Sequence, residues 1–217
     1  MYHQKIFSNH LLKAVKMTEK LVEINNHNFI IELMYADTKQ NMTGKPVYKE
    51  IGFGNKALVH KDLWNKLEQL IPWLEEHKRK LKIFDAYRPP LAHEKLREVI
   101  PQPGFFAINP ATSPHCRATA VDVCLTDENG NELTYPTLVD AYDPDYATEV
   151  QQGKSEAFFE YLKKARHDYE DASKEALHNR RELKSLMESI GLKALPHEWW
   201  HYELPNGRED DKYPMIK

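Results

Sequence analysis

Apolar positions recur along the chain with two different periods, which together predict a mixture of helices and strands. Over residues 56–80 the apolar residues gather on one face of a helix, although Pro72 is expected to kink or end part of it. Residues 155–190 show a second helical stretch, of one helix or two, and Gly191 stands where a helix C-cap is expected. Weaker helical spacing is present over residues 10–23 and 91–100.

Strand patterns alternate with these helices. Residues 119–125 form the clearest strand, and shorter strand patterns cover residues 28–35, 81–84 and 197–204. The chain shows no internal repeat and no change of composition along its length. We therefore expect one α+β domain over residues 1–217, with a central, mainly antiparallel sheet flanked by helices and a polar tail over about 206–217.

Composition narrows the classes of function. Hydrophobic residues make up 41% and charged residues 29% of the 217 positions, as in an ordinary globular protein. The net charge of −3 carries no electrostatic signature of nucleic-acid binding. No stretch approaches 18 apolar residues, and the N-terminal residues lack the apolar core of a signal peptide. We therefore expect a cytoplasmic protein that binds neither membranes nor nucleic acids. Composition says nothing about oligomeric state.

The two cysteines are too few for a disulfide framework. Cys116 and Cys124 lie eight positions apart on a segment predicted to be extended, where a bond between them would be hard to close. We expect both thiols to be reduced in a cytosolic setting.

Three short segments combine the side chains that zinc catalysis uses: residues 113–122, residues 198–201 and residues 85–88. A catalytic zinc needs three nitrogen or oxygen ligands and one open position for water. His115 ends a loop, Asp122 follows it inside the predicted strand, and His201 would come from the last strand. Two imidazoles and one carboxylate would leave the site a net positive charge and keep zinc a Lewis acid. We predict one zinc ion per chain, at the edge of the sheet.

Glu198 is the candidate general base beside this site. It would take a proton from the attacking water and later pass it to the leaving amine. On a regular strand Glu198 and His201 would point to opposite faces, so a bulge or a strand end is needed to bring both to the metal. Trp199 and Trp200 would exclude water and raise the pKa of Glu198.

Arg88 is the candidate electrophile. A fixed guanidinium facing the zinc would stabilise the oxyanion of a tetrahedral intermediate. Asp85, three residues earlier, is placed to pair with Arg88 and hold its rotamer.

Each of these signals also has an ordinary structural interpretation. A lone pair such as His115 and Asp122 is a weak metal signal, and a Trp-Trp pair usually belongs to a core. Two further classes remain open: a zinc-binding recognition domain without catalysis, and a cysteine hydrolase that uses Cys116. A structural zinc site would favour four protein ligands, often cysteines. Glu198 and Arg88 are not needed by a structural site, which favours catalysis.

Together the segments resemble the D-alanyl-D-alanine dipeptidases, a branch of zinc peptidases that also includes D,D-carboxypeptidases and L-alanyl-D-glutamate endopeptidases. The branch-wide pattern S-x-H-x-x-G-x-A-x-D is matched at Ser113, His115, Ala120 and Asp122. Ala118 stands where the pattern has Gly, and its extra methyl is expected to tighten the backbone turn without changing the ligands. Further stretches that resemble the dipeptidases are residues 35–36, 41, 43–47, 84–89, 179–181, 187–188, 191 and 198–202.

The resemblance implies a role for each matching residue. It implies zinc on His115, Asp122 and His201, Glu198 as general acid and base, and Arg88 as the transition-state stabiliser. It also implies a substrate pocket, lined by Tyr35, Ser113 and Asp143. Residues 126–150 match nothing we can place, and they are expected to form a lid or a wall of that pocket.

The implied reaction is zinc-dependent hydrolysis of D-Ala-D-Ala, or of a similar small D,D-dipeptide, to free amino acids. The near alternative is a D,D-carboxypeptidase or an L-Ala-D-Glu endopeptidase that acts on peptidoglycan peptides. Such an enzyme would need an open groove and normally export, and the missing signal peptide counts against it.

Overall fold

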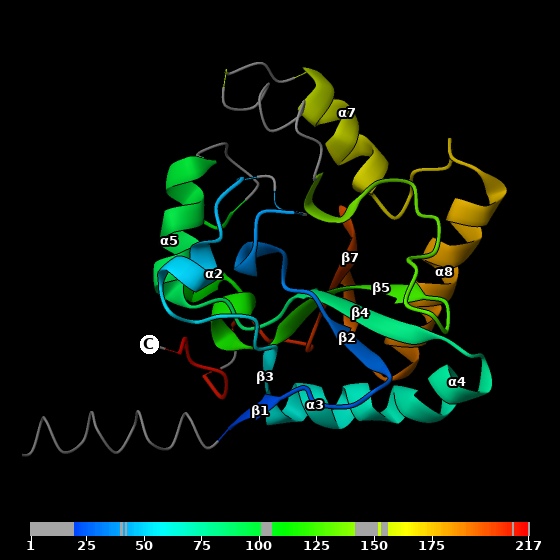
Figure 1. The fold of residues 1–217 in the computed structure, drawn as a ribbon, viewed down its shortest axis with the longest axis horizontal. Coiled ribbons are helices and arrows are strands. Elements are labelled where there is room, and N and C mark those ends of the chain that lie inside the picture. Colours follow the sequence, from blue (N-terminus) through cyan, green and yellow to red (C-terminus); the bar gives the residue numbers. More distant parts are fainter. Residues whose placement is uncertain are drawn as a thin grey trace, which may run out of the picture.

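The computed structural model describes residues 20–39, 41, 43–100, 106–141, 152, 156–209 and 211–216. Its centre is a five-stranded sheet with the strand order β2-β4-β5-β7-β6. Only the β2–β4 pair is parallel, and the other three pairs of this sheet are antiparallel. The strands are β2 (Phe29–Ile31), β4 (Lys80–Asp85), β5 (Ala120–Thr126), β7 (Glu198–Glu203) and β6 (Lys193–Leu195). The expected α+β domain with a mainly antiparallel sheet is confirmed (Figure 1).

The regular pairing of this sheet is interrupted in two places. The β4–β5 register shifts between Ile83 and Asp85, close to Arg88 in the chain. The β6–β7 register shifts between Ala194 and Leu195, so that Leu195 pairs with Glu198. A register shift re-aims the side chains that follow it. Both irregularities therefore lie next to residues that the sequence analysis proposed as catalytic, namely Arg88 and Glu198.

A second, two-stranded sheet is formed by residues that were predicted to be helical. Strands β1 (Leu21–Glu23) and β3 (Leu58–His60) pair in antiparallel fashion. The prediction of helix is therefore wrong over residues 21–23 and 58–60, and residues 1–19 lie outside the described part of the chain. Periodicity missed these strands because a three-residue strand is too short to establish a period of two.

The predicted helix over residues 56–80 is present in three pieces. They are α3 (Lys61–Leu67), the 3-10 turn η2 (Glu68–Leu70) and α4 (Ile71–Glu76). The side chain of His60 caps α3 by accepting the backbone N–H of Asp62. Pro72 stands in the first turn of α4, where its missing N–H costs nothing.

The longer remaining helices lie close to their predicted positions, whereas the shorter ones were not predicted, and the first of these replaces the end of the strand predicted over residues 28–35. Gly191 has a φ of +74° just after α8, which is the left-handed ending expected from the sequence. The longer helices are α5 (Pro90–Val99), α7 (Glu156–Ala165) and α8 (Lys174–Ser189). The shorter ones are η1 (Met34–Ala36), α2 (Val47–Glu50), η3 (Pro110–Thr112), η4 (His115–Arg117) and η5 (Val139–Ala141).

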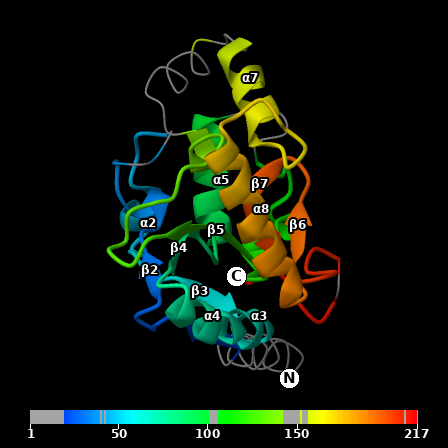
Figure 2. The same cartoon turned by 90° about the vertical axis from the view of Figure 1, so that its right-hand side faces the viewer.

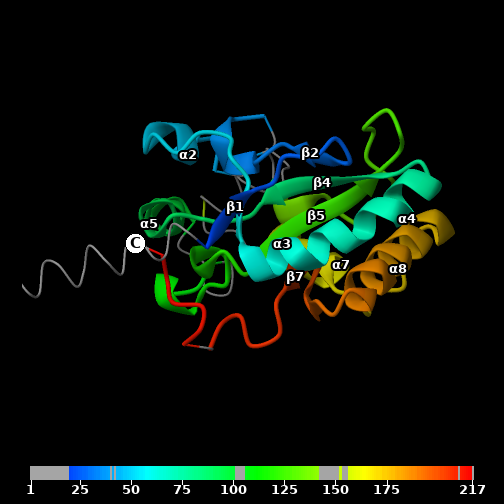
Figure 3. The same ribbon diagram turned by 90° about the horizontal axis from the view of Figure 1, so that it is seen from below.

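The core lies between the sheet and the helices that cover it. Helix α8 packs against β5, β7 and β6, and α4 packs against β4. Figure 2 shows α8 in front of the strands, and Figure 3 shows α4 next to β4 and β5. Fully buried apolar side chains from both layers meet there, among them Leu74, Leu81, Val123, Leu183 and Met187. Burying a side chain of this size contributes about 1.5–3 kcal/mol, which makes this layer the rigid support of β5 and β7.

None of the helices in the described part of the chain is long and apolar enough to cross a membrane.

Candidate metal centre

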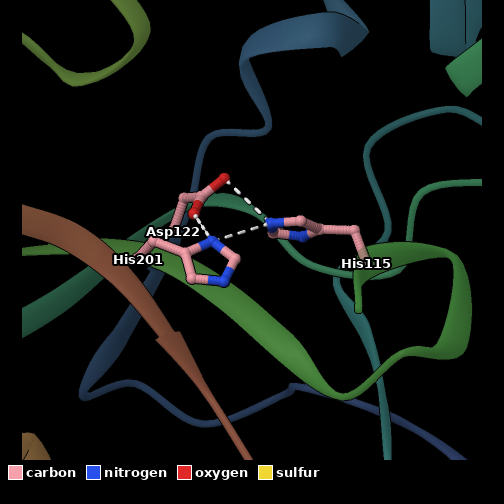
Figure 4. Close-up of side chains that lie close together, drawn as sticks. All are labelled: His115, Asp122 and His201. Atoms are coloured by element: carbon pink, nitrogen blue, oxygen red, sulfur yellow. Dashed lines mark hydrogen bonds and ion pairs between the residues drawn. The ribbon is translucent and has the colours of Figure 1, made fainter. Parts of the chain in front are cut away.

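Three chain segments bring His115, Asp122 and His201 to one point. Asp122 on β5 and His201 on β7 are direct register partners, and directly opposed residues of an antiparallel pair lie on the same face. His115 comes from η4, the turn that leads into β5. Figure 4 shows the two rings and the carboxylate pointing toward one another. The predicted grouping of these three residues is therefore present in space.

The possible ligand atoms are close enough to share one ion. Nε2 of His115 lies 3.2 Å from Nδ1 of His201 and 3.3 Å from Oδ2 of Asp122. Nδ1 of His201 lies 2.9 Å from Oδ1 of Asp122. One ligand atom from each residue lies within 4.8 Å of the other two, and all three residues are buried.

The other nitrogen of each ring is hydrogen-bonded away from this point. Nδ1 of His115 lies 2.8 Å from the backbone carbonyl of Ala86, so it must donate and leave Nε2 with its lone pair. Nε2 of His201 lies 3.1 Å from Oε2 of Glu203. Such partners fix the tautomer and the orientation of a metal-binding imidazole. Both rings are therefore set to present a lone pair to a common ion.

The electrostatics of the cluster also fit a cation. Burial raises the pKa of Asp122, but His115 and His201 outweigh burial and bring it well below its ordinary value. Burial lowers the pKa of His201, yet its hydrogen bonds to Asp122 and Glu203 raise it to about 10. A proton is thus strongly held where a metal ion would sit. Two imidazole nitrogens and one carboxylate oxygen are a donor set that suits zinc.

Asp122 and His201 lie on inner strands, so the predicted position at the edge of the sheet is not confirmed. The strand order places β5 in the middle of the sheet, and β7 lies between β5 and β6. Inner strands are paired on both sides, and this holds their backbones more firmly than an edge would.

Glu198 lies beside the cluster because the pairing of β7 is irregular there, as the sequence analysis required. It is the first residue of β7, next to the β6–β7 register shift, and its carboxylate lies 3.8 Å from Nδ1 of His201. Burial raises the pKa of Glu198, and the negative charge of Asp122 adds to this effect although His201 opposes it. Trp199 and Trp200, the next two residues, are buried. A carboxyl group with a raised pKa suits general acid and base catalysis.

Arg88 is held as predicted by Asp85, which ends β4. Nε and one Nη of Arg88 donate to Oδ2 of Asp85 at 2.9 and 2.7 Å. The other oxygen of Asp85 accepts the Tyr48 hydroxyl at 2.5 Å and the backbone N–H of Ala86 at 2.9 Å. The Arg88 backbone N–H donates to the carbonyl of His115 at 3.1 Å. This tight set of bonds ties the guanidinium to the segment that carries one of the imidazoles.

One cavity of about 380 Å³ brings these groups together. Arg88, Glu198 and all three residues of the cluster line it. The other lining residues are His93, Phe106, Ala107, Ile108, Ser113, Pro114, Asp140, Leu195, His197 and Arg208. A volume of this size is at the lower end of the range for small-molecule sites.

The three predicted pocket residues have different positions. Ser113 is buried and lines the cavity. Tyr35 is fully buried, and its hydroxyl donates to Oδ2 of Asp140 at 2.8 Å. Asp140 itself lines the cavity, so Tyr35 is connected to the cavity through this carboxylate. Asp143 lies outside the described residues.

Three residues of the site were not found from the sequence. Asp140 is a buried carboxylate with a φ of +43°, a left-handed conformation that Asp tolerates better than most residues. Glu203 accepts Nε2 of His201, and Nε of Arg208 donates to both Glu203 oxygens at 3.0 and 2.8 Å. Strand alternation would have found Glu203, because residues two apart on a strand share a face. No local pattern marks Asp140 or Arg208.

The geometry does not favour the cysteine-hydrolase alternative. Cys116 and Cys124 are both buried and free, which agrees with the expected reduced state. Burial raises the pKa of the Cys116 thiol to about 11. The nucleophilic form of cysteine is the thiolate, and a thiol with this pKa stays protonated near neutrality.

The turn that carries His115 explains why the pattern S-x-H-x-x-G-x-A-x-D has a glycine where this chain has Ala118. Ala118 ends η4 with a φ of +57°, in the left-handed region that favours glycine. Its methyl group is nevertheless fully buried, in a small apolar cluster with Tyr87 and Ile216.

Comparison with known proteins gives two matches. Residues 156–217 match the model of a family described as D-ala-D-ala dipeptidase. Over 187 residues the chain is 31% identical to the D-alanyl-D-alanine dipeptidase of Escherichia coli (strain K12). That alignment covers 86% of this chain and 82% of the bacterial protein.

Proposed function

The chain belongs to the D-ala-D-ala dipeptidase family of metallopeptidases, and from this premise we propose that it hydrolyses D-Ala-D-Ala or a similarly small D,D-dipeptide to free amino acids. The observation that carries the proposal is the convergence of the His115, Asp122 and His201 cluster, Glu198 and Arg88 on one cavity of about 380 Å³. In the proposal the three residues of the cluster hold a single zinc ion. When bound, zinc would supply the Lewis acidity that polarises a peptide carbonyl.

Glu198 is the proton carrier of the proposed reaction. Its carboxylate takes a proton from the attacking water and gives that proton to the nitrogen of the leaving amino acid. The raised pKa of Glu198 supports this role, because a carboxylate of higher pKa is a stronger base toward the attacking water, and its protonated form is still acidic enough to protonate the leaving nitrogen.

Arg88 stabilises the negative charge that develops on the carbonyl oxygen of the scissile bond. Burial works against its charge, but Asp85 more than compensates, and the pKa of Arg88 lies well above its ordinary value. The guanidinium is therefore a permanent cation. Because Asp85 already holds it in place, little reorganisation is needed when charge develops in the substrate.

Asp140 binds the free ammonium group of the dipeptide in this proposal. Its carboxylate lines the cavity, and the Tyr35 hydroxyl fixes one of its oxygens. Burial, together with the charges of Asp122 and Glu198, raises the pKa of Asp140 well above its ordinary value. A substrate ammonium would favour the ionised form of Asp140 and gain a charge-assisted hydrogen bond. Ser113, also on the cavity wall, supplies a hydroxyl for the backbone of the substrate.

Release of D-alanine from D-Ala-D-Ala tests the proposal. The protein is treated with a chelator, dialysed, and assayed with and without one equivalent of zinc. We expect no turnover without metal and recovery on adding zinc. Binding of stoichiometric zinc without turnover would instead favour the recognition domain that lacks catalysis.

A second substrate separates the dipeptidase from the D,D-carboxypeptidase and endopeptidase alternatives. A peptidoglycan stem pentapeptide is assayed beside D-Ala-D-Ala under the same conditions. The proposal expects a higher kcat/KM for the dipeptide, because Asp140 would be paired with a free ammonium group that the pentapeptide cannot place there. A preference for the pentapeptide would overturn the assigned substrate but not the peptidase chemistry.

A further inference from the structure

We propose that the segment after the last strand (residues 204–209 and 211–216, the C-terminal segment) is a positioning element that holds both histidines of the candidate metal centre. The inference rests on the proposed function, because it concerns the residues that would bind zinc. Figure 3 shows this segment, in red, running from the end of β7 along one side of the molecule. Its contacts reach His201 at one end and the turn of His115 at the other.

The first contact is a chain of hydrogen bonds to His201. Arg208 donates from Nε to both oxygens of Glu203, and Oε2 of Glu203 accepts from Nε2 of His201. A carboxylate on the outer nitrogen orients a metal-binding imidazole and raises its basicity.

The second contact holds the turn that carries His115. The backbone N–H of Ile216 donates to the carbonyl of Cys116 at 3.0 Å. One Nη of Arg117 donates to the carbonyl of Tyr213 at 2.7 Å. Cys116 and Arg117 directly follow His115 in η4. The C-terminal segment thus binds the two residues that determine where the His115 backbone lies.

Buried groups anchor the C-terminal segment itself. The Tyr213 hydroxyl donates to Oδ2 of Asp62 at 2.9 Å, and its ring packs edge-on against His60 at 4.8 Å. The Tyr87 hydroxyl donates to the carbonyl of Ile216 at 3.2 Å. Tyr213 and Ile216 are 7% and 8% exposed. This burial distinguishes the segment from a tail that merely lies on the surface.

Close approach of the backbone fixes the middle of the segment. The backbone N–H of Leu204 donates to the carbonyl of Thr119, and the Thr119 hydroxyl donates to the carbonyl of Gly207 at 3.1 Å. A Cβ at position 207 would lie 2.8 Å from the Thr119 hydroxyl oxygen, so the glycine permits this approach. The segment is thus bonded to the residue that directly precedes β5, the strand that carries Asp122.

Zinc affinity, measured by competition with a chelating dye, tests the role of Glu203. Glu203→Gln keeps the size of the side chain and removes its charge. We expect the Kd for zinc to rise about 10–100-fold, the range typical for loss of an outer partner of a ligand. The matched control is Glu132→Gln, which removes a carboxylate that binds Lys82 away from the centre, and its zinc Kd is expected to match wild type.

A matched pair at position 216 tests the second contact. Ile216→Pro removes the N–H that binds the Cys116 carbonyl, whereas Ile216→Ala keeps this N–H and loses only apolar contact. We expect Ile216→Pro to weaken zinc binding about tenfold and Ile216→Ala to weaken it less. The visible spectrum of the cobalt-substituted protein is recorded for both, because it responds to ligand geometry. We expect a shifted spectrum for Ile216→Pro alone.

The outcomes are distinguishable. If wild type binds neither zinc nor cobalt, the proposed function fails before any variant is compared. If wild type binds zinc but the folded Glu203→Gln and Ile216→Pro proteins bind it equally well, the positioning role is overturned. If Ile216→Pro does not fold, Tyr213→Phe replaces it and removes only the hydroxyl that reaches Asp62. An unchanged Kd and cobalt spectrum for both Tyr213→Phe and Glu203→Gln would also overturn it.

Discussion

Two charged clusters lie on the same sheet and differ in the group that balances their charge. One is the candidate metal centre of His115, Asp122 and His201. The other is an ion cluster around Lys82 on β4, whose ammonium contacts Glu32 at 2.5 Å and Glu132 at 2.8 Å. Lys82 pairs with Cys124, two residues along β5 from Asp122, so alternation places Lys82 and Asp122 on the same face.

The chain itself completes the Lys82 cluster. Burial lowers the pKa of Lys82, but hydrogen bonds to Glu132 and Glu32 raise it by more, and the lysine stays charged. In the metal centre, two ring nitrogens and a carboxylate face one another, and among the described residues the ion-pair partners of Asp122 are the two histidines rather than a lysine or an arginine. Buried charge alone is therefore weak evidence of a site. A set of electron-pair donors that converges on a point beside a cavity is stronger evidence, because its missing partner must come from outside.

The largest expected effect comes from removing a donor from the centre. His115→Ala should abolish both stoichiometric zinc binding and D-alanine release, because a two-donor site cannot retain the ion against solvent. Metal content after dialysis and activity on D-Ala-D-Ala are measured on the same sample. If the variant retained zinc, the assignment of His115 would be wrong, and the two clusters would differ less than we infer.

A smaller loss is expected when the donors are kept and the proton carrier is removed. Glu198→Ala should bind zinc with wild-type stoichiometry but lose about 10²–10⁴-fold in kcat, the range attributed to general acid and base catalysis. Full activity in this variant would refute the role assigned to Glu198. Zinc lost together with activity would mean that Glu198 supports the metal rather than the proton transfer.

Arg88→Ala should reduce kcat by about 10²-fold or more while KM changes less, because the guanidinium acts on charge that develops only in the transition state. Steady-state kinetics on D-Ala-D-Ala separate the two constants. A KM raised by a similar factor, with kcat unchanged, would instead identify Arg88 as a residue that binds the substrate in its ground state.

Acid should affect the two regions differently. Burial, with a contribution from Arg88, lowers the pKa of His93 to about 4 from an ordinary value of 6.5, and His93 lines the cavity. Its unfolded form binds a proton at a higher pH than its folded form, so stability should fall as pH drops from 6.5 toward 4. The raised pKa of Lys82 acts only in strongly alkaline solution.

Denaturant unfolding of wild type and His93→Gln across this pH range measures the effect. The free energy of unfolding should depend less on pH in His93→Gln than in wild type. Identical pH profiles would show that His93 does not contribute to acid sensitivity.

The smallest effect on function is expected at the ion cluster around Lys82. Lys82→Met should change the free energy of unfolding by about 1 kcal/mol or less, because Glu32 and Glu132 both reach solvent and can be hydrated once the ammonium is gone. Zinc affinity and kcat should match wild type. A large loss of zinc binding would show that the two clusters are coupled along β5.

Several elements were predictable because their information is local. The strand over residues 119–125 and the helices around α8 follow from residues that are neighbours in sequence, as does the left-handed ending at Gly191. Strands β1 and β3 were not predictable, because each has only three residues and pairs with a strand far away in the sequence.

What the sequence alone determined is a set of candidate reacting side chains: His115, Asp122, His201, Glu198 and Arg88 stand in motifs whose spacing resembles a known family. It also indicated that Glu198 needed an irregular strand, because alternation forbids the regular one. The tertiary structure decided where the cluster lies, which residues surround it and how Asp140, Glu203 and the C-terminal segment support it. Those contacts join segments far apart in the chain, so strand register and backbone packing, rather than any local pattern, determine them.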